Sequence, residues 1–162
     1  MLLTGNHIVN ASASTVWLML MDPDVLAKVV PGISGLQKIS DNSFKSILNI
    51  KIGPVSSSFA GSLQLEDMVE QKSFTLKAQQ NSKIGNANAV VKINLAAMSD
   101  AETEVKFDGD VKISGMLATM GQRLLGGVAN ALTKQFFENL DKEIIAKESP
   151  MVRDTITKSA SF

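Results

Sequence analysis

Histidine, cysteine and tyrosine, three of the residue types that most often act in catalysis or metal binding, are nearly absent from this 162-residue sequence. The chain has a single histidine, His7, and it contains no cysteine and no tyrosine. The lack of cysteine excludes disulfides, thiolate metal sites and cysteine nucleophiles. A general acid or base would have to come from Asp, Glu or Lys, and a carboxylate metal site would suit calcium or magnesium rather than zinc.

The candidates that remain have simpler structural explanations. His7 falls in a predicted first strand, where a structural or surface role is favoured over a ligand or acid–base role. Asp22 and Asp24 form a carboxylate pair, but helix capping and the helix dipole account for both. Four further acidic residues lie at alternating positions on or near a predicted strand, which is typical of a solvated face: Glu102, Glu104, Asp108 and Asp110. We therefore predict no catalytic residue, no metal site and no cofactor.

Charge and hydropathy narrow the class of protein further. Sixteen basic side chains balance sixteen acidic ones, so the chain lacks the electrostatic signature of a nucleic-acid-binding protein. The first residues, "MLLTGNHIVNASAS", lack the basic flank and long apolar run of a signal peptide. No stretch approaches the roughly 18 apolar residues that span a bilayer. We expect a cytoplasmic protein.

Hydrophobic periodicity predicts an α+β fold. A short strand over Thr4–Val9 precedes two short helices, one capped by Ser12 or Ser14 and one beginning at Asp22-Pro23. From about residue 44 the period changes to two, which indicates an antiparallel sheet with one wet and one buried face. A long helix over about Met116–Ile145 follows. We expect one domain over residues 1–147, with Pro150 ending the helix and residues 148–162 forming a mobile tail.

The predicted inner face of the sheet and the predicted helix stripe raise a question of packing. Several inward positions of the sheet are small: Ser57, Gly61, Ala78, Ala87, Ala89 and Gly109. The helix stripe comprises Leu117, Met120, Gly121, Leu124, Leu125, Val128, Leu132 and Phe136, while Phe137 is predicted to meet a strand edge or a partner. Small residues mean either close packing or a gap between sheet and helix. The twist of the sheet and the adaptable Met116 and Met120 favour a gap.

Three stretches carry a resemblance to a known family: "LTGNHIVNASASTVWLMLMDPDVLAKVVPG", "IGPVSSSFAGSLQLED" and "VKISGMLATMGQRLLGGVANALTKQFFENL". Their V-W-x-x-L, D-P, P-G, G-P-V, F-x-G and F-F elements resemble, in order and spacing, the family of the carbon monoxide dehydrogenase G subunit. That family is part of the START-like, or helix-grip, superfamily (also SRPBCC). The resemblance covers about residues 1–145. It implies a curved antiparallel sheet of about six or seven strands around a long C-terminal helix.

The resemblance also implies a function. START-like domains enclose an apolar cavity, and proteins of the G-subunit family are implicated in bringing a molybdenum hydroxylase to the inner face of the cell membrane and in handling quinone. The implied ligand is a quinone, a fatty acid or another lipid. The implied lining is Trp17, Leu20, Leu26, Val29, Val30, Phe59, Met116, Leu117, Met120, Leu124 and Val128. The two short helices and the Pro31-Gly32 turn would form the mouth.

Two other functions remain open from the sequence alone. A docking module would have a collapsed cavity and would use its surface alone. A START-like cyclase or hydrolase would need a polar acid–base group in the cavity, which the predicted apolar lining does not supply. Met151, Val152 and Ile156 could form one apolar edge of the tail, but the segment is short and polar, so a mobile tail is favoured over a membrane anchor.

Overall fold

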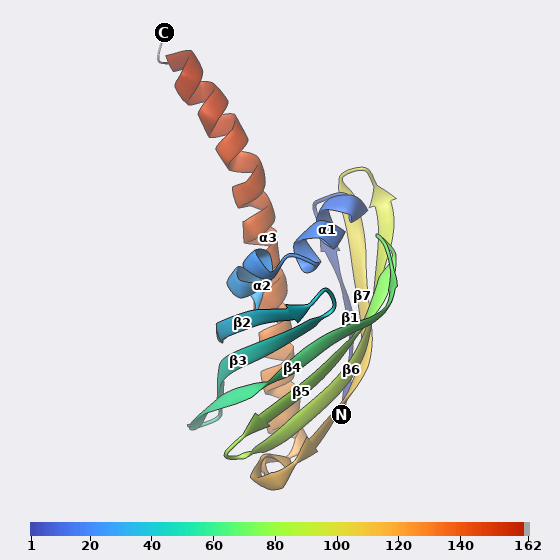
Figure 1. The fold of residues 1–162 in the computed structure, drawn as a ribbon, viewed down its shortest axis with the longest axis vertical. Helices are drawn as coiled ribbons and strands as arrows, with labels where there is room; N and C mark the ends of the chain where they lie inside the picture. Colours follow the sequence, from blue (N-terminus) through green and yellow to red (C-terminus); the bar gives the residue numbers. More distant parts are fainter. Residues whose placement is uncertain (161–162) are drawn as a thin grey trace.

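A seven-stranded antiparallel sheet curves around one long helix in the computed structural model (Figure 1). The structure describes residues 1–160, and side chains up to residue 147. The elements, in chain order, are β1 (Leu2–Val9), α1 (Ala13–Leu20), α2 (Pro23–Val29), β2 (Ile33–Ser40), β3 (Ser43–Ile52), β4 (Val55–Val69), β5 (Ser73–Ser82), β6 (Gly85–Ser99), β7 (Glu102–Ser114), a 3-10 helix (Gly115–Met120) and α3 (Gln122–Ala160). The strand order is β1-β7-β6-β5-β4-β3-β2, so β1 and β2 are the two edges.

Local sequence signals place the two short helices. The Ser12 hydroxyl accepts a hydrogen bond from the backbone N–H of Thr15 at 3.2 Å and caps α1. The Asp22 carboxylate accepts from the N–H of Asp24 at 2.9 Å, and Pro23 occupies the first turn of α2. The capping role predicted for Asp22 is confirmed, and Ser12 rather than Ser14 caps α1.

The strand register confirms the predicted inner face. Hydrogen-bonded pairing aligns Ser46 with Gly61, Gly61 with Gln80, Gln80 with Ala87 and Ala87 with Ile113 across five strands. Because side chains two residues apart share a face, this row fixes the face of every other strand position. The small residues predicted to face inward all share that face: Ser57, Gly61, Ala78, Ala87, Ala89 and Gly109.

The long helix begins and ends at residues other than those expected. A 3-10 helix covers Gly115–Met120, and Gly121 has a φ of 89°, so α3 begins only at Gln122. The prediction of one continuous helix from Met116 was wrong, because the left-handed conformation of Gly121 separates the 3-10 helix from α3. The prediction that Pro150 ends the helix was also wrong, since α3 continues to Ala160. Mobility of residues 148–162 stays a prediction; the side chains of Met151, Val152 and Ile156, and residues 161–162 altogether, lie outside the described part.

The main core joins the two short helices, the sheet and the middle of α3. Met19, Val9 and Val16 on the N-terminal elements and Leu140 on α3 are completely buried. Trp17 lies edge-on to Phe74 of β5, with ring centroids 5.8 Å apart. A hydrogen bond holds α2 on α3 as well: Asn139 Nδ2 donates to the Val29 carbonyl at 3.1 Å. This core closes one end of the space between sheet and helix.

Gly61 is a position where the close approach of two strands requires glycine. A Cβ added there would overlap the carbonyl oxygen of Gln79, whereas a Cβ added at Gly127 on α3 would meet nothing within 4 Å. We expect Gly61→Ala to lower the free energy of unfolding by about 1–3 kcal/mol through overpacking. The matched change Gly127→Ala should raise it by about 0.5–1 kcal/mol through helix propensity. Urea unfolding of both variants checks the pair, and similar effects of the two would contradict the close approach.

Candidate functional site

Two apolar cavities lie between the inner face of the sheet and α3. The larger has a volume of about 260 Å³ and is lined by Leu3, Leu20, Leu76, Val91, Ile93, Val105, Phe107, Leu132, Thr133, Phe136, Phe137 and Leu140. The smaller has a volume of about 140 Å³ and is lined by Met1, Leu48, Ile50, Ile52, Phe59, Gln80, Ala87, Ile113, Leu117, Leu125, Val128, Ala129 and Leu132. Leu132 of α3 borders both, so the two cavities meet at this side chain.

The sheet presents several small side chains where it faces α3, and one of them, Ala87, lines the smaller cavity. Ala78, Ala87 and Ala89 lie close to one another on two neighbouring strands, and each is only half-buried. Ala78 and Ala89 line neither cavity, and larger apolar side chains form most of both linings. Interiors without such gaps reach a packing density near 0.74. The predicted gap between sheet and helix is therefore present, divided in two by Leu132.

Polar groups are scarce in this lining. Thr133 uses its hydroxyl within the helix, donating to the Ala129 carbonyl at 2.8 Å. Gln80 reaches across Gly61 to Ser46, and its Nε2 donates to Ser46 Oγ at 3.1 Å. Among the described residues, no ionisable side chain lines either cavity. The space thus suits an apolar molecule, because an unpaired charge buried there would be costly.

The structure divides the predicted lining residues between different places. Leu20 lines the larger cavity, and Phe59, Leu117 and Val128 line the smaller one. Met120 packs beside the smaller cavity. Four others belong to the main core instead, namely Trp17, Leu26, Val29 and Val30. Met116 is 61% exposed, and Leu124 is 38% exposed beside the turn at Gly53. For all of the residues in this predicted lining, the role in binding a ligand stays a prediction.

Phe137 points into the molecule together with Phe136. It is buried, lines the larger cavity and stacks on His7 at 4.5 Å and on Phe107 at 5.8 Å between ring centroids. Phe136 also lines that cavity, with its ring edge-on to Phe137. The prediction that Phe137 would meet a strand edge is confirmed, because His7 lies on the edge strand β1, whereas the prediction that Phe136 and Phe137 could not both face inward was wrong. A curved sheet surrounds more of the helix than a flat one would, so side chains 100° apart both meet it.

A polar hollow of about 480 Å³ adjoins the larger cavity between the edge strand β1 and α3. The hollow and the cavity share four residues as a common wall: Leu3, Phe107, Thr133 and Phe137. His7 lies on the polar side, where its Nε2 is 3.0 Å from Asp141 Oδ2. His7 thus supports Phe137 and joins β1 to α3, which is a structural role.

Pro31 and Gly32 were predicted to form the cavity mouth, but they line neither cavity.

Charged side chains form pairs on the outer face of the sheet. Lys77 and Glu66 are 2.8 Å apart, and their hydrogen bond and charge attraction raise the pKa of Lys77. A hydrogen bond from Asn6 lowers the pKa of Glu104. The outer face also has a hollow of about 620 Å³, lined by polar side chains such as Lys45 and Asn81 together with apolar ones such as Ile47 and Leu36. It shares no residue with the two apolar cavities.

A curved antiparallel sheet around a long C-terminal helix, with two short helices after the first strand, defines the START-like, or helix-grip, fold. A START superfamily protein from Mycobacterium smegmatis superposes with a TM-score of 0.71 at 13% identity, covering 90% of this chain and 97% of its own. The Zhui aromatase/cyclase from Streptomyces sp. R1128 superposes with a TM-score of 0.69 at 11% identity, covering 88% and 92%. These likenesses establish the fold.

A sequence model of the CoxG family, which describes the G subunit of carbon monoxide dehydrogenase, matches residues 5–145, and the chain belongs to that family. A conserved protein from Geobacillus kaustophilus is similar at 29% identity, with a TM-score of 0.86 over 90% of this chain and 96% of its own. A comparison with curated protein sequences gives no match. Within the described residues, no helix is both long enough and apolar enough to cross a bilayer.

Proposed function

We propose that this protein is a non-catalytic carrier that holds an apolar ligand, a quinone or a lipid, between its sheet and α3. The observation that supports this most is the pair of apolar cavities joined at Leu132. Apolar cavities with very few polar groups are typical of sites for hydrophobic small molecules. Movement of the Leu132 side chain would join the two into one elongated space, which matches a molecule with a long apolar body.

The lining supports binding over catalysis. START-like relatives include a cyclase, and cyclisation or hydrolysis requires a positioned acid or base. The described lining of both cavities consists of apolar side chains with Gln80 and Thr133 as the polar exceptions. Neither an amide nor a helix-bonded hydroxyl titrates near neutral pH. A carrier needs no such group, because it gains affinity from burial of apolar surface.

Family membership suggests where the ligand is used. We propose that the protein serves a carbon monoxide dehydrogenase-like molybdenum hydroxylase, by recruitment to the membrane or by electron transfer through a quinone, on the cytoplasmic face. A tagged copy expressed in its source cells should then co-purify with subunits identified by mass spectrometry as a molybdenum hydroxylase. Recovery of the tagged protein without such subunits, from cells that express the hydroxylase, would contradict this part of the proposal.

Native mass spectrometry tests the carrier function. We expect the purified protein to retain a mass excess that organic extraction identifies as a quinone or lipid, or to take up menaquinone or a fatty acid on titration. A clean protein mass together with no uptake of either compound would contradict the proposal. That result would favour the alternative, a docking module that acts through its surface alone.

A further inference from the structure

The charges of this chain balance overall, but they are divided between the two ends of the sheet. Three connections gather at one end: the β3–β4 turn, the β5–β6 turn and the segment that leads from β7 through the 3-10 helix into α3 (Figure 1). Every charged side chain in residues 48–59, 81–89 and 111–128, which form these connections, is a cation: Lys51, Lys83, Lys112 and Arg123. We refer to this end as the cationic end.

The turns at the opposite end of the sheet are mostly acidic. They join β2 to β3, β4 to β5 and β6 to β7, over residues 38–42, 66–73 and 98–104. Two lysines, Lys38 and Lys72, stand there among seven carboxylates: Asp41, Glu66, Asp67, Glu70, Asp100, Glu102 and Glu104. Exposed apolar side chains occur at this end too, as at Met98. A negatively charged surface would nevertheless be repelled here and attracted at the cationic end.

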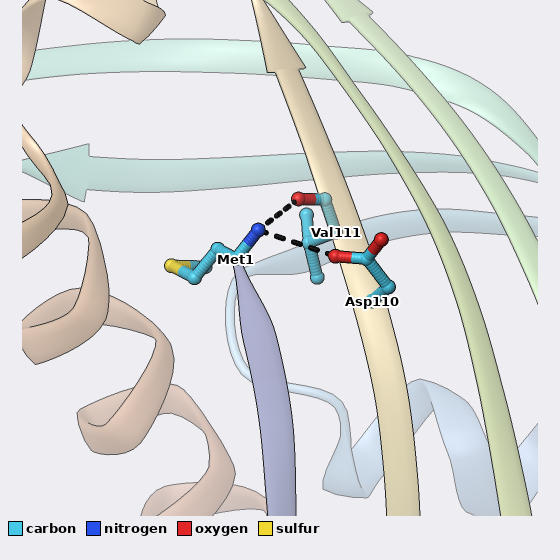
Figure 2. Close-up of polar contacts among 3 residues, drawn as sticks. All are labelled: Met1, Asp110 and Val111. Atoms are coloured by element: carbon cyan, nitrogen blue, oxygen red, sulfur yellow. Dashed lines mark hydrogen bonds and ion pairs between the residues drawn. The ribbon is translucent and has the colours of Figure 1, made fainter.

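The charge of the cationic end is available to an external partner. Its four cations are exposed, and among the side chains described, up to residue 147, none of the four is in an ion pair. The acidic residue that precedes Lys112 on the same face of β7 is Asp110. Figure 2 shows that the Met1 amino group already neutralises it, 3.2 Å from Asp110 Oδ1 and 2.9 Å from the Val111 carbonyl oxygen.

The same three connections expose apolar side chains and contact one another. Met116 of the 3-10 helix is 61% exposed, and Leu124 in the first turn of α3 is 38% exposed. The β3–β4 turn lies against Leu124, because a Cβ built on Gly53 would be 3.5 Å from it. The N–H of Leu117 donates to the Ile84 carbonyl at 2.6 Å, which holds the 3-10 helix on the β5–β6 turn. Exposed apolar groups among cations are typical of surfaces that bind anionic membranes.

The inner side of the cationic end is a wall of the smaller cavity. Ile52, Leu117 and Leu125 are buried in that wall, and each directly follows an exposed residue of the cationic end. Gly115 begins the 3-10 helix and Gly121 follows it, with φ values of 74° and 89°. The connections that would meet a partner at this end are therefore the same ones that enclose the smaller cavity.

We propose that the cationic end docks on a lipid bilayer with anionic headgroups and places Met116 and Leu124 at the interface. An acidic protein would match the charge equally well, but a bilayer is also the phase in which a strongly apolar ligand dissolves. Docking in this orientation brings the wall of the smaller cavity against that phase. The inference rests on the proposed carrier function and names the surface from which the carrier is loaded.

Co-sedimentation of the full chain with vesicles in 0.15 M salt tests the docking surface. We expect vesicles of equal parts phosphatidylcholine and phosphatidylglycerol to bind the protein at least tenfold more tightly than vesicles of phosphatidylcholine alone. The triple variant Lys51→Gln/Lys83→Gln/Arg123→Gln should lose at least tenfold in affinity for the anionic vesicles, because each cation near such a surface contributes about fivefold. All three side chains are exposed, so the variant should fold.

The triple variant Lys38→Gln/Lys72→Gln/Lys142→Gln is the matched control. It removes the same charge from exposed positions that lie outside the cationic end. Screening limits the reach of such charges to about 8 Å at this salt concentration, so affinity for the anionic vesicles should stay within about threefold of the unmodified protein. Equal losses in the two triple variants would mean that net charge alone attracts the protein, and would overturn the docking surface.

Tryptophan fluorescence tests the orientation. Met116→Trp places an indole at the proposed interface, and Met98→Trp places one at the acidic end, while Trp17 is buried and gives a constant background. Anionic vesicles should shift the emission of Met116→Trp to shorter wavelength and leave that of Met98→Trp unchanged. A shift of Met98→Trp alone would overturn the proposed orientation.

Uptake of the fluorophore N-phenyl-1-naphthylamine and of menaquinone without vesicles tests the carrier function separately. Uptake by a protein that does not bind anionic vesicles would overturn the docking surface while the carrier function stands, and would favour an acidic protein as the partner of the cationic end. Vesicle binding that depends on the cationic end, by a protein that takes up neither compound, would support the docking surface and contradict the carrier function.

Discussion

Replacement of Leu132 by tryptophan is expected to weaken binding of apolar ligands at least tenfold without unfolding the protein. Leu132 borders both cavities, so an indole ring at this position would occupy their junction. The ligand would then have to displace a packed side chain rather than enter an existing space. Overpacking typically costs about 1–3 kcal/mol, which a domain with this core can tolerate. Displacement of the bound fluorophore N-phenyl-1-naphthylamine by apolar ligands measures the loss of affinity. Thermal unfolding measures the change in stability.

The neighbouring residue supplies the control for this variant. Ala131 is exposed on α3 and lines neither cavity, so Ala131→Trp adds the same side chain to the outside of the helix. It should leave ligand affinity within about twofold of the unmodified protein. Equal ligand affinity in the two tryptophan variants would show that the space around Leu132 is not where the ligand binds.

Replacement of Phe137 by alanine should produce the largest loss of stability, about 3–5 kcal/mol of unfolding free energy. Phe137 is buried, stacks on His7 and Phe107, and joins the edge strand β1 to α3. For a domain of this size each kcal/mol corresponds to roughly 2–4 °C in Tm, so a decrease of about 10 °C is expected. Thermal unfolding followed by circular dichroism measures it.

Phe136→Ala is the matched change for Phe137→Ala. Phe136 is only half-buried and lines the larger cavity, so its truncation enlarges that cavity and removes less buried contact. We expect a decrease in Tm of less than half that of Phe137→Ala. A larger decrease for Phe136→Ala would mean that Phe137 does not hold β1 against α3.

The sheet could be predicted from the sequence because its physical signal is local. Alternation of apolar and polar residues fixes a face without reference to any other strand, and β3 to β7 follow it closely. The same signal does not reveal β2: "ISGLQKIS" lacks clean alternation, and its pairing with β3 contains two register shifts. An edge strand with one partner tolerates such irregularity, so its pattern is weaker.

The binding site was harder to predict because it depends on contacts between distant residues. Apolar side chains at the two short helices have the right character for a cavity wall, yet Trp17 and Val29 pack in the main core. Conversely, Gln80 does not stand out from the polar run "KAQQNS" in which it lies. Strand register could have drawn attention to it, since the alternation that places Phe74, Leu76 and Ala78 inward also places Gln80 inward.

The start and end of the long helix illustrate the same limit. Met116, Leu117 and Met120 fit the helical stripe by spacing, so the stripe extends over Gly121 in the sequence pattern. Only the φ of 89° at Gly121 shows that the chain changes direction there. The turn places Leu117 in the wall of the smaller cavity and leaves Met116 exposed, although both fit the same periodic pattern.

Methyl NMR during titration with menaquinone tests the central claim most directly, namely that the apolar space between sheet and α3 holds the ligand. The account predicts shifts for methyl groups that line the cavities, such as those of Leu132, Val128 and Val91. Methyl groups on the outer face, at Val90 and Ile47, should not change. Shifts confined to the outer face, or no shifts at saturating menaquinone, would contradict it.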